Sequence, residues 1–341
     1  MAGTILGMRG FDMGDAQLNT VDRSDDTRVI ASNSYAHTGA YSLKLGGTDS
    51  KTTSTEWGRW RLSGDPSNPS VSAWVFLYGR FNETGTGTVN HNIRYRLTDG
   101  TFVELRWNGA THTYDAYVNG VLFKAGTVEV SVNTWFHVQF YATINAAGNI
   151  TVLIDGHESI NKNGDTLPGA ADTVDYVYIY GGGGSSYDYV DDLVFGYGGL
   201  LGSLRVRERV PNRDASVAWT PSAGSDNYAL VDEVPPNDAD YNIANSDGLL
   251  DQLGLTTIDF ATLEEVPVAL MPWVRAQMNE GTGDSITVGL DSNGTAVNTQ
   301  SALSTAWEYY FHRTAVEDPD GGGQPWDTAS ANAAELTYES A

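Results

Sequence analysis

The chain contains no cysteine, which excludes both a disulfide framework and a thiol nucleophile. Positive charge is also scarce, since 19 Lys and Arg stand against 43 Asp and Glu and give a formal net charge of −24. Nucleic acid and anionic membranes would be repelled by this charge, so neither is expected as a partner. No apolar run approaches the roughly 20 residues of a membrane-spanning helix, and no secretory signal opens the sequence. These absences predict a protein that folds in a bacterial cytoplasm and does not insert into a membrane.

The residue spacings that several enzyme classes need are missing as well. A retaining glucanase of this kind carries its acid and its nucleophile on one strand, in the pattern Glu-x-Asp-x-x-Glu. Glu104 does not begin such a pattern, because the residue two positions after it is not a carboxylate. There is no Gly-x-Ser-x-Gly turn, no phosphate-binding Gly-Lys-Ser/Thr loop and no His-x-x-x-His pair. The sequence therefore predicts that the chain is not an enzyme.

What the chain has in abundance are the residues of turns and strands. It holds 38 Gly, 18 Tyr and 9 Trp, with only 18% charged residues. Residues 135–142 alternate between two faces, residues 145–149 are turn formers, and a β-branched run returns at 150–154. Asn119-Gly120 lies between two further short strands and is a strong hairpin signal. The fold class predicted is all-β, built from antiparallel strands.

Several of these motifs together resemble the concanavalin A-like lectin/glucanase sandwich, including its laminin-G-like members. They are the Trp-bearing strand at 135–142, its hairpin to a strand that ends in Asp155-Gly156, and the closing strand at 189–195. The resemblance covers about residues 1–198. It implies that the closing strand pairs with the first strand, near residues 5–11. It also implies a fold that binds sugars or proteins and hydrolyses sugars only in certain branches.

A second domain is expected after a glycine-rich junction at 196–202. The order of Trp219, the segment 227–238, Trp307 and Trp326 resembles a module at the C-terminus of tailed-phage virion proteins, where it commonly follows a concanavalin A-like domain. We therefore expect domains at 1–198 and 199–341, the second a smaller jelly-roll-like β-sandwich. Strands are expected near residues 204–210, 228–231, 266–278, 285–290, 307–314 and 334–338.

The two resemblances together imply a non-enzymatic structural protein of the bacteriophage virion surface, either a tail or fibre component or a head decoration. Its expected partners are other virion proteins and a host-surface glycan. A homo-oligomer is expected, with a trimer favoured, because repeated weak sites gain avidity. The basic run 205–209 would contact an acidic neighbour. The alternative is a secreted carbohydrate-active enzyme or its carbohydrate-binding accessory module, which the missing carboxylate spacing and export signal disfavour.

Aromatic side chains are the best candidates for ligand binding. Tyr176, Tyr178 and Tyr180 share one face of a predicted strand, and Trp135 lies on the side of its strand away from the expected core. Rings of this kind stack on the C–H faces of sugars, and Asp188 in the neighbouring loop would accept from hydroxyl groups. The same rows also fit a sandwich core or a subunit interface, and both interpretations stay open.

Calcium is the only cofactor that the sequence indicates. Asp155, Asp191 and Asp192 are expected near strand ends, where oxygen ligands for calcium commonly gather. Asp191 and Asp192 are adjacent, so on a regular strand they would point to opposite faces. Solvated turn aspartates explain the same pattern. Residues 181–184 form a run of glycines, interpreted as a flexible hairpin tip rather than a phosphate loop.

Overall fold

The computed structural model of the chain describes residues 4–9, 21–23, 29–45, 56–61, 72–82, 92–181, 187–198, 204–234, 236–263, 266–279, 284–312, 315, 317–321 and 324–341. The chain divides into two compact units, Met1–Arg207 and Glu208–Ala341, and each is described by itself. Almost all regular structure is antiparallel strand, so the all-β prediction is confirmed. Within the described ranges, no helix is both long enough and apolar enough to cross a membrane.

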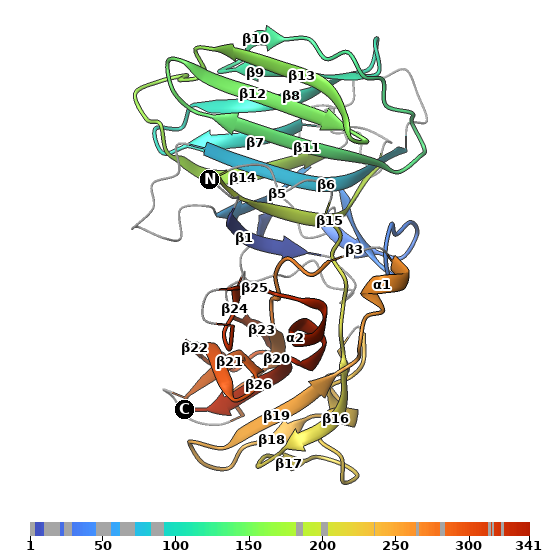
Figure 1. The fold of residues 1–341 in the computed structure, drawn as a ribbon, viewed down its shortest axis with the longest axis vertical. Helices are drawn as coiled ribbons and strands as arrows, with labels where there is room; N and C mark the ends of the chain where they lie inside the picture. The colour runs from blue at the N-terminus through green and yellow to red at the C-terminus, as the bar shows by residue number, and fades with distance from the viewer. Residues whose placement is uncertain are drawn as a thin grey trace. The chain divides into compact units, whose positions relative to one another are not determined.

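The N-terminal unit is a sandwich of two antiparallel sheets (Figure 1). The eight-stranded sheet follows the order β13-β12-β11-β6-β15-β4-β3, with β1 paired to β15. Its strands are β1 (Thr4–Arg9), β3 (Val29–Ser32), β4 (Ser42–Leu45), β6 (Ser72–Asn82), β11 (Phe136–Thr143), β12 (Gly148–Ile154), β13 (His157–Gly164) and β15 (Tyr187–Tyr197). The seven-stranded sheet follows the order β10-β9-β8-β7-β14-β5-β2. Its strands are β2 (Val21–Arg23), β5 (Glu56–Arg61), β7 (Asn92–Leu97), β8 (Phe102–Asn108), β9 (Thr113–Val118), β10 (Val121–Lys124) and β14 (Val174–Gly181).

The hairpins predicted from turn residues form where expected. Asn119 and Gly120 both take a positive φ, 45° and 83°, which is the backbone that a two-residue hairpin turn requires. They join β9 to β10, whose register begins with Val121 opposite Val118. The strands β11 and β12 likewise pair over residues 138–154. The implied pairing of the closing strand with the first is confirmed, since β1 lies along β15.

The core lies between the two sheets and decides which side chains face outward. Alternate residues of β11, among them Val138 and Phe140, are fully buried in it, as are Ile93 and Tyr95 of β7. The Tyr95 hydroxyl donates a 2.5 Å hydrogen bond to the Phe140 carbonyl, and so connects the two layers. Because strand side chains alternate, the residues between these core positions lie on the sides of the sheets away from this core, where His137 and Gln139 of β11 are nevertheless buried.

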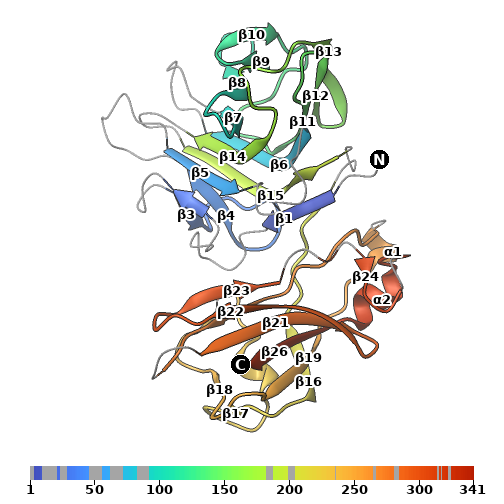
Figure 2. The same ribbon diagram turned by 90° about the vertical axis from the view of Figure 1, so that its left-hand side faces the viewer.

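The C-terminal unit is built on a five-stranded sheet with the order β16-β19-β26-β21-β22, seen in Figure 2. The strands are β16 (Pro211–Ser216), β19 (Leu250–Leu255), β21 (Ser285–Ser292), β22 (Thr295–Ala302) and β26 (Glu335–Ser340). Three two-stranded sheets accompany it: β17 (Thr220–Pro221) with β18 (Asn242–Ile243), β20 (Trp273–Ala276) with β23 (Glu308–Phe311), and β24 (Glu317–Asp318) with β25 (Gln324–Pro325). Short helices are η1 (Tyr228–Leu230), α1 (Phe260–Leu263) and α2 (Thr328–Ala333).

Two predicted strands of this region are wrong. The segment expected as a strand at 228–231 is the helix η1, because Asp214 accepts the backbone N–H groups of Asn227 and Tyr228 and turns the chain there. The basic run 204–210 is irregular: the Val206 amide donates to the Asp192 carboxylate and the Val210 amide to the Thr256 hydroxyl, rather than to the backbone of a neighbouring strand. Arg209 alone donates to the carbonyls of Thr256, Ala331 and Asn332, among others.

The boundary between the units falls after Arg207, later than the glycine-rich junction at 196–202. Residues just beyond that junction still pack on the N-terminal unit. The Val206 amide donates to Asp192 over 3.1 Å, and the Arg205 guanidinium lies 4.1 Å from the centre of the Tyr78 ring. The basic run is thus engaged within the chain at Arg205 and Arg209.

Candidate functional site

A row of tyrosines lies on the outer face of the seven-stranded sheet. Val177 and Ile179 of β14 point into the core, so Tyr176, Tyr178 and Tyr180 occupy the opposite face of the strand. The rings of Tyr178 and Tyr180 stack at 5.6 Å with an interplanar angle of 11°. Tyr176 and Tyr178 follow at 5.9 Å. The three rings therefore form one continuous aromatic strip along the strand, in which Tyr176 and Tyr180 are partly exposed and Tyr178, in the middle, is only 5% exposed.

Arginines of the neighbouring strand fix this strip in place. Strand β7 pairs with β14 so that Arg94 is opposite Tyr178 and Arg96 is opposite Tyr176. Arg94 donates to the Tyr180 hydroxyl and Arg96 to the Tyr178 hydroxyl, each over 3.2 Å. The tyrosine hydroxyls are thus held by charged donors, which restricts the rotation of the rings.

A buried carboxylate organises the arginines. Glu104 of β8 is fully buried and lies between Arg94 and Arg106, both of which approach it with two nitrogens. Arg94 Nε and its terminal nitrogen are 2.8 and 2.7 Å from one Glu104 oxygen. Arg106 bonds the other oxygen, through Nε at 2.5 Å and through a terminal nitrogen. One carboxylate therefore serves two guanidinium groups, and each is held in a fork-like geometry.

Aromatic rings flank the same arginines. The Arg94 guanidinium lies 4.1 Å from the centre of the Phe102 ring and 4.7 Å from that of Tyr180. The Arg106 guanidinium lies 4.2 Å from the centre of the Tyr117 ring. These are cation–π distances, and they add a further constraint on the position of each charge. We call the outer surface formed by Arg94, Arg96, Glu104, Arg106, Tyr176, Tyr178 and Tyr180 the tyrosine–arginine face.

The hydroxyl of Tyr180 is set up to donate a hydrogen bond. Burial raises the pKa of Tyr180 above its ordinary value, and the nearby Arg94 offsets this only in part. The group is therefore a neutral phenol near pH 7. Because its oxygen accepts from Arg94, its own proton remains for another acceptor, such as an oxygen of a ligand.

Trp135 does not join this face. It lies just before β11 of the eight-stranded sheet, and its ring meets that of His37 edge-on at 5.6 Å. His37 in turn stacks on Tyr78 of β6 at 3.7 Å. The predicted aromatic residues therefore separate into two groups, one on each sheet of the sandwich.

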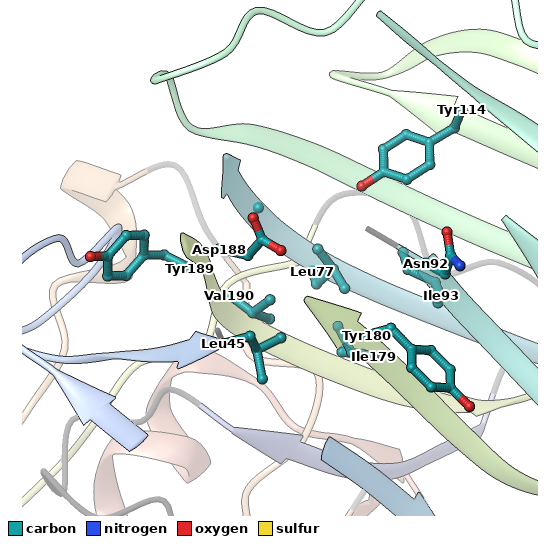
Figure 3. A pocket seen from close by; sticks show the side chains of 11 residues that line it. Leu45, Leu77, Asn92, Ile93, Tyr114, Ile179, Tyr180, Asp188, Tyr189 and Val190 are labelled. Atoms are coloured by element: carbon teal, nitrogen blue, oxygen red, sulfur yellow. The ribbon is translucent and has the colours of Figure 1, made fainter. Parts of the chain in front are cut away.

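Asp188 lies in the interior rather than in an exposed loop. It is only 3% exposed and lines a small pocket between the layers with Leu45, Leu77, Tyr114 and other residues (Figure 3). Burial raises the pKa of Tyr114 well above its ordinary value, and the Asp188 carboxylate adds to that shift. Asp188 is thus a buried carboxylate among mainly apolar side chains of the two layers, and Tyr180 also lines this pocket.

Asp191 and Asp192 point to the same loop, contrary to the expectation that adjacent strand residues face apart. The pairing of β15 with β6 shifts register after Asp191, and Asp192 takes a positive φ of 48°. Asp191 accepts from the amides of His37 and Thr38, over 2.8 and 3.1 Å. Asp192 is 2.9 Å from both His37 Nδ1 and the Thr38 hydroxyl. Burial, and then the charge of Asp192, raise the pKa of Asp191 to about 8.

Asp155 holds the end of the β12–β13 hairpin. It has a positive φ of 48°, and its carboxylate accepts the His137 amide over 2.8 Å. Its own amide donates back to the His137 carbonyl over 2.9 Å. Across the described part of the chain, no three His, Asp or Glu side chains are grouped so that they could hold a metal ion. Calcium binding stays a prediction, while the described contacts of Asp155, Asp191 and Asp192 are hydrogen bonds to protein groups.

The sequence itself carries a signal for the pair of arginines around Glu104. The turn at Asp99-Gly100 joins β7 to β8, and counting outward from it places Arg94 opposite Glu104. Arg106 follows Glu104 by two residues, on the same face. The Glu-x-Asp-x-x-Glu pattern asks only for a second carboxylate after Glu104 and takes no account of this basic partner. The predicted glycine-rich tip at 181–184 lies, from residue 182 on, outside the described residues.

Comparisons with known proteins identify no family for this chain. No family model matches the chain, and no curated protein matches it. Solved structures similar to it include an endo-β-1,4-glucuronan lyase from the fungus Trichoderma reesei, at 12% identity and a TM-score of 0.44, over 57% of this chain and 96% of that one. The PL-14 alginate lyase from Aplysia kurodai matches at 12% identity and a TM-score of 0.42, over 52% and 90%. A carbohydrate esterase of the Shiga toxin-encoding bacteriophage phi24B matches at 14% identity and a TM-score of 0.43, over 58% and 100%.

These comparisons correct the prediction that the chain is not an enzyme. Two of the three similar proteins are named as lyases and the third as an esterase, so the predicted exclusion of catalysis is wrong. The reasoning failed because a missing Glu-x-Asp-x-x-Glu pattern excludes one glycosidase mechanism only.

Proposed function

We propose that the N-terminal unit is the carbohydrate-recognising part of a carbohydrate-active protein or accessory module, and that it binds polysaccharide on the tyrosine–arginine face. The observation that carries this proposal is the strip formed by Tyr176, Tyr178 and Tyr180 on the outer side of the sheet. Sugar rings present apolar C–H surfaces, which stack on aromatic rings, and hydroxyl groups, which need polar partners beside those rings. Both kinds of surface lie within this one face.

The strip is suited to an extended ligand rather than to a single sugar. Alternate residues of a strand are separated by roughly 6.6 Å, so the two partly exposed rings, Tyr176 and Tyr180, lie roughly 13 Å apart along β14 with the buried Tyr178 between them. The bonds from Arg94 and Arg96 keep the hydroxyls of Tyr180 and Tyr178 in place before a ligand arrives. Binding therefore costs little side-chain ordering, which favours affinity.

Individual polar groups of the face have roles that follow from their contacts. Glu104 is buried and shared by two arginines, so it serves to position them rather than to reach a ligand. Tyr180 is a neutral phenol with a proton to donate, which suits a sugar oxygen. The groups that would touch a ligand are thus the rings of Tyr176 and Tyr180, the Tyr180 hydroxyl and the outer sides of the arginines, whereas the buried Tyr178 ring supports its two neighbours.

Binding of the full chain to a polysaccharide panel tests the proposal. Affinity gel electrophoresis with immobilised polysaccharides would compare wild type with Tyr176→Ala and with a control, Tyr241→Ala, an exposed tyrosine of the C-terminal unit. We expect at least a tenfold loss of affinity for Tyr176→Ala and none for Tyr241→Ala, with both proteins folded by circular dichroism. Binding that is equal in all three proteins would refute the assignment to this face. Release of reducing or unsaturated sugar ends by the wild type would show that the bound polysaccharide is also cleaved.

We propose in addition that this recognition takes place on the surface of a phage particle, with the protein present in repeated copies. The order of the C-terminal motifs around Trp219, Trp307 and Trp326 supports this setting. Mass spectrometry of purified particles and light scattering of the isolated protein test it. Absence from particles, or a monomer at micromolar concentration, would count against the setting while leaving the polysaccharide site untouched.

A further inference from the structure

We infer that the polysaccharide-binding surface extends beyond the tyrosine–arginine face, so that a bound chain continues across the strands to Tyr117 of β9 and Leu122 of β10. This inference rests on the proposed function and names two further contact residues and the length of ligand that the site requires. It comes from a second set of apolar side chains on the same side of the seven-stranded sheet. Phe102, Tyr117 and Leu122 form this set, which we call the distal apolar group.

The pairing of the strands puts the distal apolar group on the outer side of the sheet. Ala116 belongs to the core, so the next residue, Tyr117, points away from it. In the ladder, Glu104 lies opposite Arg94 on one side and opposite Tyr117 on the other. Leu122 is then opposite Tyr117. One row of outward-facing residues therefore leads from the tyrosine–arginine face to β10, the last strand of this sheet.

Cation–π contacts connect the distal apolar group to the tyrosine strip. The Arg94 guanidinium is 4.7 Å from the centre of the Tyr180 ring and 4.1 Å from that of Phe102. The Arg106 guanidinium is 4.2 Å from the centre of the Tyr117 ring. Both guanidinium groups are bound to one buried carboxylate, so the rings on its two sides are held in one connected arrangement.

The apolar surface of the group is exposed where the row ends. Tyr117 is partly exposed and Leu122 is 52% exposed, whereas Glu104 in the middle of the row is fully buried. A single exposed leucine is common on protein surfaces and needs no explanation. Here a partly exposed ring lies directly opposite the leucine, and side chains paired in this way across two strands make one joint contact surface.

The distance between the two groups of rings sets a minimum length for the ligand. Strand β14 carries the tyrosine strip and is separated from β9 by β7 and β8. Three interstrand spacings of about 4.8 Å amount to roughly 14 Å. An aromatic contact reaches only about 4.5–7 Å between ring centres, so a single sugar cannot touch Tyr180 and Tyr117 together. A chain of several sugars can, and its second contact then forms at a high effective concentration.

Binding of oligosaccharides of increasing length to the full chain tests the inference. Isothermal titration calorimetry would use dextran, mannan, xylan and polygalacturonate, and the disaccharide to octasaccharide fragments of each. The variants are Tyr117→Ala and Leu122→Ser, with Val121→Ser as the matched control. Val121 is the neighbour of Leu122 in the same strand and is 71% exposed, but alternation turns its side chain to the other side of the sheet.

For the polymer that the wild type binds, we expect affinity to rise at least about tenfold from the disaccharide to the octasaccharide. Tyr117→Ala should lower octasaccharide affinity at least about fivefold and Leu122→Ser about threefold, because each removes apolar surface from the second contact. Val121→Ser should bind as the wild type does. If Tyr117→Ala fails to fold by circular dichroism, Leu122→Ser at its exposed position decides alone.

The outcomes separate this inference from the proposed function. Octasaccharide affinity that is unchanged in Leu122→Ser and in folded Tyr117→Ala, but lost in Tyr176→Ala, would overturn the inference and keep the proposed function. Affinity that does not rise with length would overturn the inference as well. Binding of none of the polymers by the wild type would overturn both.

Discussion

Replacing Glu104 by glutamine tests whether one buried carboxylate holds the tyrosine–arginine face together. Glu104→Gln keeps the size of the side chain but removes the charge that Arg94 and Arg106 share. Removing one partner of a buried ion pair typically costs about 3–5 kcal/mol. The two arginines retain partial exposure and can recover some hydration, so we expect the lower end, about 3 kcal/mol.

The loss should appear in the unfolding of the N-terminal unit. A stability loss of about 3 kcal/mol lowers the midpoint of a unit of this size by roughly 6–12 °C. Differential scanning calorimetry would measure it, and Glu335→Gln provides the control. Glu335 pairs with Arg213, which is 60% exposed, so its replacement should cost at most about 1 kcal/mol. A loss below about 1 kcal/mol for Glu104→Gln would show that the arginines do not depend on the carboxylate, and the argument for a pre-organised face would fail.

Three further predictions concern other parts of the chain. The folded pKa of Asp191, about 8, lies above its unfolded value near 4, so the folded state loses stability as pH rises from about 4 to 8. In chemical denaturation, the difference in unfolding free energy between pH 5 and pH 9 should be several kcal/mol smaller for Asp191→Asn than for the wild type. An equal difference in the two proteins would show that the Asp191 carboxyl is ionised in the folded state. Asp251→Ala should cost about 3 kcal/mol or more in the C-terminal unit, because buried Asp251 accepts from Trp219, Asn227 and others; a loss under 1 kcal/mol in denaturant melts would contradict this. Gly148→Ala should destabilise the N-terminal unit by about 1–3 kcal/mol, since a Cβ there would collide with the Thr166 hydroxyl, and an unchanged melting temperature would be the contrary result.

The fold of the N-terminal unit could be predicted from the sequence where turn-forming residues lie between segments whose side chains alternate between two faces. The hairpin at Asn119-Gly120 formed as expected, because few residue pairs take positive φ so readily. The tyrosine strip was also predicted to share one face, since alternation alone fixes that. The sequence of β14 did not determine which of its two faces is the outer one. That depends on the packing of Val177 and Ile179 against the opposite sheet, which is a tertiary contact.

The parts that could not be predicted depend on distant contacts. The bulge that turns Asp191 and Asp192 to one side requires the loop of His37, more than 150 residues away. The helix η1 at Tyr228 forms because Asp214 captures its first amides, whereas its own sequence suits a strand. Short-range patterns cannot specify either arrangement, because the partner lies far along the chain.

The position of β15 has a consequence for synthesis of the protein. This strand is the last of its unit, yet it pairs with β1, β4 and β6 in the eight-stranded sheet. The ribosome makes about 5–20 residues per second, so β1 waits on the order of 10–40 s for its partner to emerge. During that interval the edges of β4 and β6 that β15 will pair with are open to other strands. A chain in which β15 is deleted or delayed therefore leaves these two edges available for pairing with strands of other chains.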